Sequence, residues 1–114
     1  MINEAYCSYE VSKLLKEKGM DKKYFTHYIQ KNNTDGTSEA VTTCTHQMAM
    51  HWLREVHHIA INIGWGEIFE DIYQWWSIVL NMDNGNILYD ENYNASYEDA
   101  VETALKIVLN DLKK

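Results

Sequence analysis

The stretch that decides the fold class runs from Thr45 to Trp65 and reads THQMAMHWLREVHHIAINIGW. Its first part has the pattern of a helix ending near His58. Thr45 suits the N-cap, and apolar residues then recur every three or four positions: Met48, Ala49, Trp52, Leu53 and Val56. Its second part, Ile59–Trp65, alternates like a strand with one buried face: Ile59, Ile61, Ile63 and Trp65. A helix that passes directly into a strand predicts a mixed α and β fold.

The residues after this strand predict a hairpin of two more strands. Gly64 and Gly66 are expected to end the first strand. The segment Ile72–Met82 then has one face made of Trp76, Ile78, Leu80 and Met82 and another made of Tyr73, Trp75, Ser77 and Val79. Because both faces are apolar, this strand is expected at the centre of the sheet. Asn84-Gly85 is the preferred pair of a type I′ turn, which returns the chain through a partner strand, Asn86–Asp90.

The two ends of the chain predict helices. The first runs from about Ala5 to Lys18, with Gly19 at the C-terminal cap and Met20 closing it by an apolar contact. The last begins after Ser96, which forms a capping box with Asp99. Its inward side is expected to consist of Val101, Ala104, Leu105, Val108 and Leu112. Between the first two helices, a hairpin turning at Asp35-Gly36 is expected to pair residues 24–31 with residues 40–43.

The predicted fold class is therefore α+β, in the order α-β(β)-α-β-β-β-α. We expect an antiparallel sheet of four or five strands with three helices packed mainly on one face. Residues 1–114 form a single small domain, because no repeat or linker interrupts the chain and it contains no proline. The expected core includes Trp52, Ile61, Ile63, Leu105 and Val108.

Composition limits the setting in which the protein acts. With 46% hydrophobic and 24% charged residues, the chain has the balance of an ordinary globular protein. It has no apolar run long enough to span a membrane, and the segment from Met1 to Tyr6 lacks the pattern of a secretory signal. We therefore expect a cytoplasmic protein. Cys7 and Cys44 fit no metal-binding spacing, and a reducing compartment would keep them as free, buried thiols.

The charge balance disfavours general nucleic-acid binding. The formal net charge is −7, with 17 acidic against 10 basic residues, so most of the surface repels phosphate. Arg54 is the only arginine, and it lies almost opposite the apolar stripe of its helix. It is either an ordinary exposed charge or an anion contact. A role as an acidic imitation of nucleic acid is weakened because the sequence has no acidic run.

Three residues of the same helix invite a metal site. His51, Glu55 and His58 lie at positions i, i+4 and i+7, and therefore on one side. The two histidines are nevertheless about 10 Å apart along the axis, too far to share one ion without bending the helix. A solvated polar face is the simpler interpretation. The sequence thus predicts no stoichiometric zinc, no other cofactor and no catalytic constellation.

The candidate ligand-binding residues are Arg54, His57, Tyr73 and Trp75. If the sheet face that carries Tyr73 and Trp75 is uncovered, it forms an apolar patch of the kind that marks a ligand or partner surface. The alternatives are plainer. Trp75 and Trp76 can both belong to the core, and His57 and His58 can simply interact with the helix dipole.

Three segments resemble a family of small uncharacterised proteins found in gut Bacteroides and their phages. They are AYCSYEV and LLKEKG within residues 5–19, THQMAMHWLREVH at 45–57 and SYEDAV at 96–101. The resemblance implies a phage or mobile-element setting and no known activity. In that setting we expect a non-enzymatic binding protein that counters host defence, either by sequestering a small nucleotide signal or by blocking a host protein.

The alternative function is a small metal-assisted or hydrolytic enzyme that uses His51, Glu55 and His58. We also expect a homo-oligomer, because a two-fold axis near the second helix would bring two copies of Arg54 together in an otherwise acidic protein.

Overall fold

The computed structural model describes residues 5–112, and the side chains of these residues except at positions 68 and 91–93. Residues before Ala5, on which the expectation about a secretory signal partly rests, lie outside this range. The fold is α+β in the predicted order. Its elements are α1 Tyr9–Glu17, the 3-10 helix η1 Lys22–Tyr24, β1 His27–Asn32, β2 Ser38–Thr43, α2 His46–His57, β3 Ile59–Phe69, β4 Ile72–Asn81, β5 Ile87–Asn94 and α3 Tyr97–Asp111. No helix within residues 5–112 is long and apolar enough to cross a membrane.

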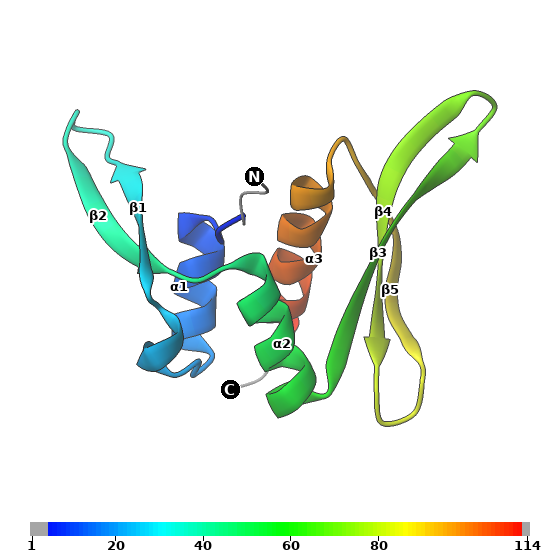
Figure 1. Cartoon of the computed structure of the whole chain (residues 1–114), viewed down its shortest axis with the longest axis horizontal. Coiled ribbons are helices and arrows are strands. Elements are labelled where there is room, and N and C mark those ends of the chain that lie inside the picture. The colour runs from blue at the N-terminus through cyan, green and yellow to red at the C-terminus, as the bar shows by residue number, and fades with distance from the viewer. Residues whose placement is uncertain (1–4, 113–114) are drawn as a thin grey trace.

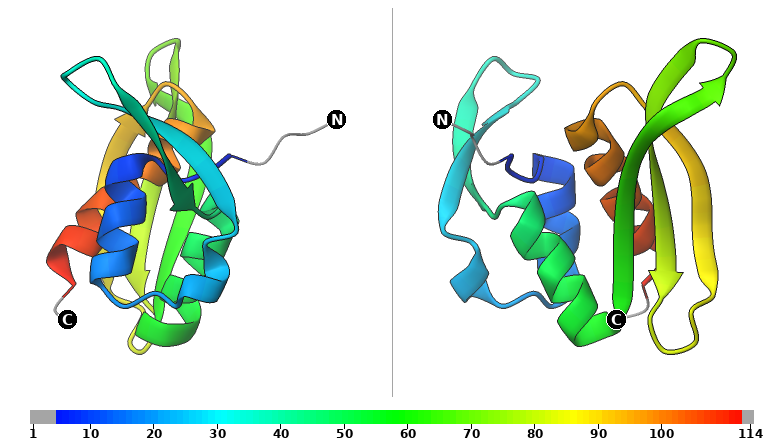
Figure 2. Two further views of the ribbon diagram at one scale, coloured as in Figure 1. Left: turned by 90° about the vertical axis from the view of Figure 1, so that its left-hand side faces the viewer. Right: turned by 45° about the vertical axis from the view of Figure 1, so that its right-hand side comes forward.

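The strands form two antiparallel sheets, so the expectation of one sheet with four or five strands is wrong. β3, β4 and β5 make a three-stranded sheet with β4 at its centre, as predicted, and β1 and β2 make a separate two-stranded sheet. The helices lie between this two-stranded hairpin and the three-stranded sheet (Figures 1 and 2). α2 and α3 pack on the sheet, while α1 packs against α3 and β2. The helices therefore separate the two sheets, which periodicity alone could not reveal.

Local signals in the sequence fix both ends of α1. The helix begins later than predicted, because residues 5–7 are extended and Tyr6 pairs with Thr45 in an antiparallel bridge. Ser8 is the N-cap and accepts a hydrogen bond from the N–H of Val11. At the other end, Gly19 has φ +96° and Met20 donates to Leu15 O at 3.0 Å. This is the glycine-capped helix end that the sequence predicts.

α2 has the predicted caps but a rotated core face. Thr45 caps its N-terminus, and His58 ends it in the left-handed conformation at φ 55°. Ala49, Trp52 and Leu53 are buried as predicted, whereas Met48 and Val56 are exposed. The buried stripe passes instead through His46 and Met50: His46, Ala49, Met50, Trp52 and Leu53. The side of α2 that carries Met48 therefore lies on the surface of the protein.

The glycines of β3 do not end the strand, contrary to the prediction. β3 continues through Gly64 and Gly66, and the chain turns only at Asp71, which has φ 60°. Gly64 lies opposite Trp76 on β4, and a Cβ atom at Gly64 would overlap the indole ring. The missing side chain makes room for a tryptophan that lies across the strand, so Gly64 fits a continuous strand here.

The loop between β4 and β5 also differs from the prediction. A type I′ turn needs positive φ at both Asn84 and Gly85, but only Gly85, at φ 73°, has it. The strands are joined instead by residues 82–86, with the N–H of Gly85 bonded to Asn81 O at 2.8 Å. The predicted hairpin and its partner strand are confirmed, and the turn type is not.

The face of β4 that looks toward the helices carries Ser77 and Val79, which are fully buried. Tyr73 lies beyond the helices and is exposed, and Trp75 is half-buried. The opposite face carries Trp76, also half-buried. The interpretation that both tryptophans belong to the core is therefore wrong: each is partly covered, on opposite faces of the sheet.

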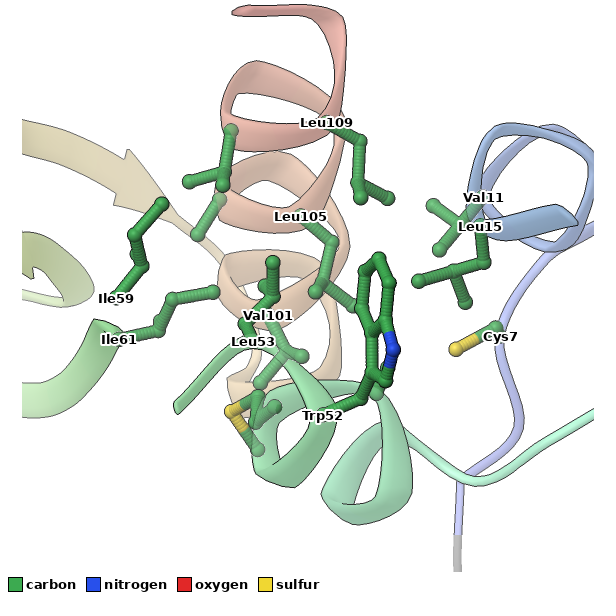
Figure 3. Close-up of a cluster of buried hydrophobic side chains, with 14 of the residues drawn as sticks. Cys7, Val11, Leu15, Trp52, Leu53, Ile59, Ile61, Val101, Leu105 and Leu109 are labelled. Carbon is green, nitrogen blue, oxygen red and sulfur yellow. The ribbon is translucent and has the colours of Figure 1, made fainter. Parts of the chain in front are cut away.

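The core surrounds α3, which contributes the largest set of buried residues (Figure 3). Ser96 caps α3 by accepting from the N–H of Asp99 at 3.0 Å. The buried residues of α3 are Ala100, Val101, Ala104, Leu105, Val108 and Leu109, while Leu112 packs at the edge. Of the five predicted core residues, Trp52, Ile61, Leu105 and Val108 are buried. Ile63 is only partly buried and packs against them.

Replacing Trp52 with alanine should reduce the free energy of unfolding by roughly 3–5 kcal/mol, because a large buried aromatic ring is lost from the centre of the core. Chemical denaturation measures this change. Val56→Ala on the same helix is the matched control. Val56 is 57% exposed, so its loss should change stability by less than about 0.5 kcal/mol. Equal effects of the two substitutions would contradict the described orientation of α2.

Adding one methyl group at Gly64 should also destabilise the fold, because it displaces the ring of Trp76. We expect Gly64→Ala to cost about 1–3 kcal/mol and to change the tryptophan fluorescence of the native protein. Gly66→Ala, two residues away on the same strand, meets nothing within 4 Å and should be nearly neutral. If the two variants unfold at the same denaturant concentration, Trp76 does not lie over Gly64.

Candidate functional site

An open groove with a volume of about 1060 Å³ lies beside α2. Its walls come from four places: the exposed side of α2, the segment between η1 and β1, the middle of β3 and the first residue of α3. It therefore lies where the hairpin layer, the helices and the three-stranded sheet meet. The lining residues are Tyr24, Thr26, His27, Thr45, Gln47, Met48, Met50, His51, Arg54, Ile61, Asn62, Ile63 and Tyr97.

One wall of the groove is a face of α2. Gln47, His51 and Arg54 are three or four positions apart, so they project from the same side of the helix. All three are exposed, whereas Met50 between them is buried and reaches the groove from the core. The buried stripe that anchors α2 thus leaves Arg54 and His51 pointing at the groove.

The facing wall carries aromatic rings. His27 stacks at a tilt on Tyr6, with ring centroids 4.7 Å apart, and its Nδ1 is hydrogen-bonded to Thr26 Oγ1 at 3.1 Å. Tyr24 lies on the same segment and also lines the groove. At the α3 end, Tyr97 is held by an edge contact with Trp75, with ring centroids 5.5 Å apart. Aromatic side chains therefore stand on two sides of the hollow.

The electrostatic character of the groove differs from that of the chain. The chain has a net charge of −7, yet the residues that line the groove include Arg54, His27 and His51 and no carboxylate. The apolar part of the lining comes from Met48, Ile61 and other core-edge residues. A groove with one permanent cation, two imidazoles and flanking aromatic rings suits an anion that also carries an apolar or aromatic part.

No protein family, curated protein or solved structure matches this chain.

The four predicted ligand-binding residues lie in different surroundings. Arg54 lines the groove, and Trp75 supports its edge through Tyr97. Tyr73 instead stacks on Trp65 near the end of the β3–β4 hairpin, with ring centroids 5.0 Å apart.

His57 does not line the groove, since its ring packs edge-on against Trp52 with centroids 4.7 Å apart. Burial lowers the pKa of His57, and its Nε2 atom has no partner among the described residues. The ring of His57 thus packs beside Trp52 and is not part of the groove lining.

The histidine stripe of the alternative, enzymatic function is divided between two hollows. His51 faces the groove, whereas Glu55 and His58 line a smaller hollow of about 470 Å³. His58 Nδ1 is hydrogen-bonded to Asp83 Oδ1 at 2.9 Å on the surface. Within residues 5–112 these three side chains are not among the groups that converge closely enough to hold a metal ion.

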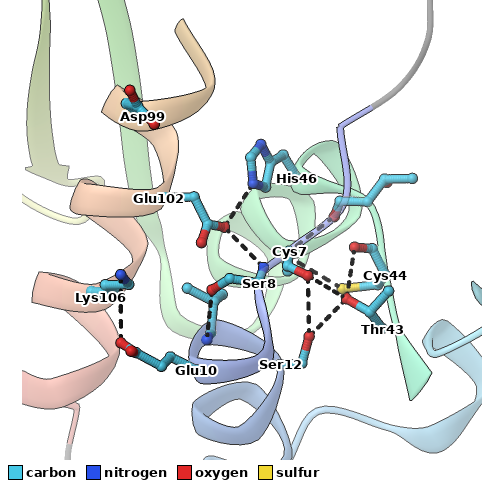
Figure 4. A network of polar contacts seen from close by, with 12 residues as sticks. Cys7, Ser8, Glu10, Ser12, Thr43, Cys44, His46, Asp99, Glu102 and Lys106 are labelled. Carbon is cyan, nitrogen blue, oxygen red and sulfur yellow. Dashed lines mark hydrogen bonds and ion pairs between the residues drawn. The ribbon is translucent and has the colours of Figure 1, made fainter. Parts of the chain in front are cut away.

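A buried polar cluster lies elsewhere, where α1, α2 and α3 approach one another (Figure 4). His46 Nε2 donates to Glu102 Oε2 at 2.7 Å, and the N–H of Ser8 donates to the same oxygen at 3.2 Å. These hydrogen bonds lower the pKa of Glu102 although burial, the largest single effect, acts to raise it. Two buried cysteines lie beside this pair, Cys7 and Cys44, with sulfur atoms 3.9 Å apart.

The two cysteines are chemically unequal. Their mutual hydrogen bond, together with burial, raises the pKa of the Cys7 thiol, and the same hydrogen bond lowers the pKa of Cys44. Both are free and fully buried, as the sequence predicts. Their proximity was not predicted. Each cysteine directly precedes a helix N-cap, Ser8 or Thr45, and this is the one hint in the sequence. The two cysteines meet because the segments before these helices pair, through the bridge between Tyr6 and Thr45.

Proposed function

We propose that this protein binds, without catalysing a reaction on it, a small anionic ligand that carries an aromatic ring, and that the ligand is of the nucleotide class. The groove beside α2 is the binding site. The observation that carries this proposal is the lining of the groove: one arginine and two histidines without a carboxylate, in a protein with a net charge of −7.

The charge argument favours phosphate over other anions. A guanidinium group offers a planar fork of donors that matches two phosphate oxygens, and Arg54 is the only group of this kind in the chain. His51 precedes it by one turn on the same helix face, and His27 stands on the opposite wall. An anion approaching an acidic protein meets the least repulsion at such a place.

The remaining lining suits a base. Tyr24 and Tyr97 present aromatic faces or edges, and Met48 and Ile63 add apolar surface. Bases stack on aromatic side chains with a gain of about 1–3 kcal/mol each. A hollow of about 1060 Å³ is at the upper end of the range for small-molecule sites, so a dinucleotide would also fit by volume.

The resemblance to proteins of gut Bacteroides and their phages suggests the biological setting of this proposal. In such a host, a small cytoplasmic protein that holds a nucleotide can counter defence by keeping an immune signal from its receptor. The enzymatic alternative with His51, Glu55 and His58 has less support, because these residues face two different hollows.

We further propose that the protein forms a homo-oligomer. The end of the β3–β4 hairpin carries an apolar tip of four exposed side chains, Trp65, Phe69, Ile72 and Tyr73. Apolar patches of this kind are usually covered in a working protein. We take a second copy of the chain as the occupant, since two identical tips can cover each other about a two-fold axis. Blockade of a host protein would use the same tip.

Arg54→Ala should weaken nucleotide binding by roughly 10- to 100-fold, as expected when charge-assisted hydrogen bonds to phosphate are lost. The probes are ribonucleoside monophosphates, 3′,5′-cyclic nucleotides and cyclic dinucleotides, measured by calorimetry with the purified protein. The matched nucleosides, which lack phosphate, should bind weakly to both proteins. Arg54 is exposed, so the variant should melt at the same temperature as the parent protein.

Lys13→Ala is the control for this experiment, because it removes the same charge from an exposed site on α1 outside the groove. It should leave the affinity unchanged at moderate salt. Equal losses in the two variants would mean that binding follows net charge alone. If no nucleotide in the panel binds the parent protein, the nucleotide proposal is wrong.

Light scattering at tens of micromolar should give a molar mass of at least two chains. Replacing Phe69 and Tyr73 together with serine should shift the protein toward the monomer, because both are more than half exposed at the hairpin tip. Tyr28→Ser is the control, since Tyr28 is 70% exposed on the other hairpin. A parent protein that is strictly monomeric under these conditions would contradict self-association.

A further inference from the structure

Four residues outside the proposed groove form a buried cluster: Cys7, Cys44, His46 and Glu102. Its members come from distant parts of the sequence and meet at the ends of helices. Cys7 directly precedes the N-cap of α1, Cys44 and His46 flank the N-cap of α2, and Glu102 lies on α3. The bridge between Tyr6 and Thr45 aligns the first two segments, and the N–H of Cys7 donates to Cys44 O at 2.9 Å.

Three donor atoms of this cluster lie close enough together to share one metal ion. Cys7 Sγ, a ring nitrogen of His46 and a carboxylate oxygen of Glu102 all lie within 4.8 Å of one another. Cys44 Sγ lies 3.9 Å from Cys7 Sγ. Two thiolates bound at about 2.3 Å in a tetrahedral zinc site are separated by about 3.8 Å, almost the same spacing. Cys44 Sγ is not within 4.8 Å of all three of these atoms, so the Cys44 side chain has to turn toward His46 and Glu102 to complete the site, which is a change of rotamer.

The chemical types of the donor atoms indicate which metal would bind. Two thiols, one imidazole and one carboxylate form a set of soft and borderline ligands, which suits Zn²⁺ and is poor for Mg²⁺ or Ca²⁺. Four protein ligands close the coordination sphere, as in structural and not catalytic zinc sites. The N–H of Ser8, which donates to Glu102 Oε2, would orient the carboxylate as outer-sphere partners of metal ligands commonly do.

The burial of these four side chains also favours a metal site. Cys7 and Cys44 are fully buried, and the side chains of His46 and Glu102 are only 5% and 19% exposed. Nδ1 of His46 is also buried and has no hydrogen-bond partner among the described residues. Collecting four polar or ionisable groups in one buried place is costly unless they are paired or coordinate a metal. The hydrogen bond between His46 and Glu102 accounts for these two side chains, but it does not account for the two cysteines next to them.

We propose that Cys7, Cys44, His46 and Glu102 bind one Zn²⁺ ion that joins the N-terminal ends of α1 and α2 to α3. This proposal departs from the sequence-based expectation of a protein without zinc, which rested on the stripe of His51, Glu55 and His58 and on the lack of a metal-binding spacing at Cys7 and Cys44. The ion is structural. Its removal should loosen the contact between α1 and the other helices while the three-stranded sheet persists.

The first test uses the full chain expressed with zinc in the medium and purified with a thiol reductant and no chelator. Elemental analysis should find about one zinc per chain, and a strong chelator should lower the melting temperature by at least about 10 °C. Cys44→Ser should lose the zinc. The control, His51→Ala, removes a histidine of α2 outside the cluster and should keep both the zinc and its response to the chelator.

Cobalt provides a test that does not depend on the folding of a variant. Co²⁺ added to the metal-free parent protein should produce a thiolate-to-cobalt charge-transfer band with the intensity of two sulfur ligands and the visible spectrum of tetrahedral cobalt. Zinc should abolish both signals.

Three results would overturn the proposal: substoichiometric zinc without a charge-transfer band, zinc retained in Cys44→Ser, or a Cys7–Cys44 disulfide in the protein as purified. None of them affects the nucleotide proposal, because none of the four residues lines the groove.

Discussion

The packing of α3 between α1 and the three-stranded sheet is the contact on which the rest of the structure depends. α3 touches α1, α2 and all three strands of the sheet. Its buried positions occupy a wide face of the helix, from Ala100 to Leu109, so a single neighbour could not cover them. The sheet covers one side and α1 with α2 the other. This arrangement fixes the place of α2, whose outer side becomes a wall of the groove, and it carries Glu102 to the two cysteines.

The sequence contains much of the local structure, because helix caps and periodic apolar residues act over a few positions. Thr45, Ser96 and Gly19 each have the capping role that their residue types suggest, and the direct passage from α2 into β3 is present. The errors concern contacts between distant segments. Gly64 was expected to break a strand because the sequence does not show that Trp76 lies opposite it. The two sheets looked like one because strand patterns do not reveal which layers the helices separate.

The candidate site illustrates the same limit. The rarity of arginine and the helical phase of Arg54 are visible in the sequence, and both led to a residue that lines the groove. The absence of carboxylates from the groove lining is not visible in the sequence, since the lining comes from four segments. The cysteine cluster is still more distant from any local pattern: Cys7 and Glu102 are 95 positions apart and meet only because α1 packs on α3. His57 is close to Arg54 in the sequence but packs on Trp52 outside the groove, a contact that the sequence does not show.

The position of α3 after the sheet in the chain has a consequence for how the protein folds. β3, β4 and β5 precede the helix that packs on them, and Val79 and Ile61 belong to the core that they share with it. A sheet formed without α3 would have only α2 to cover its inner face. The core therefore depends on contacts between segments that are far apart in the sequence, and contacts of this kind slow folding because the chain between them has to be ordered first.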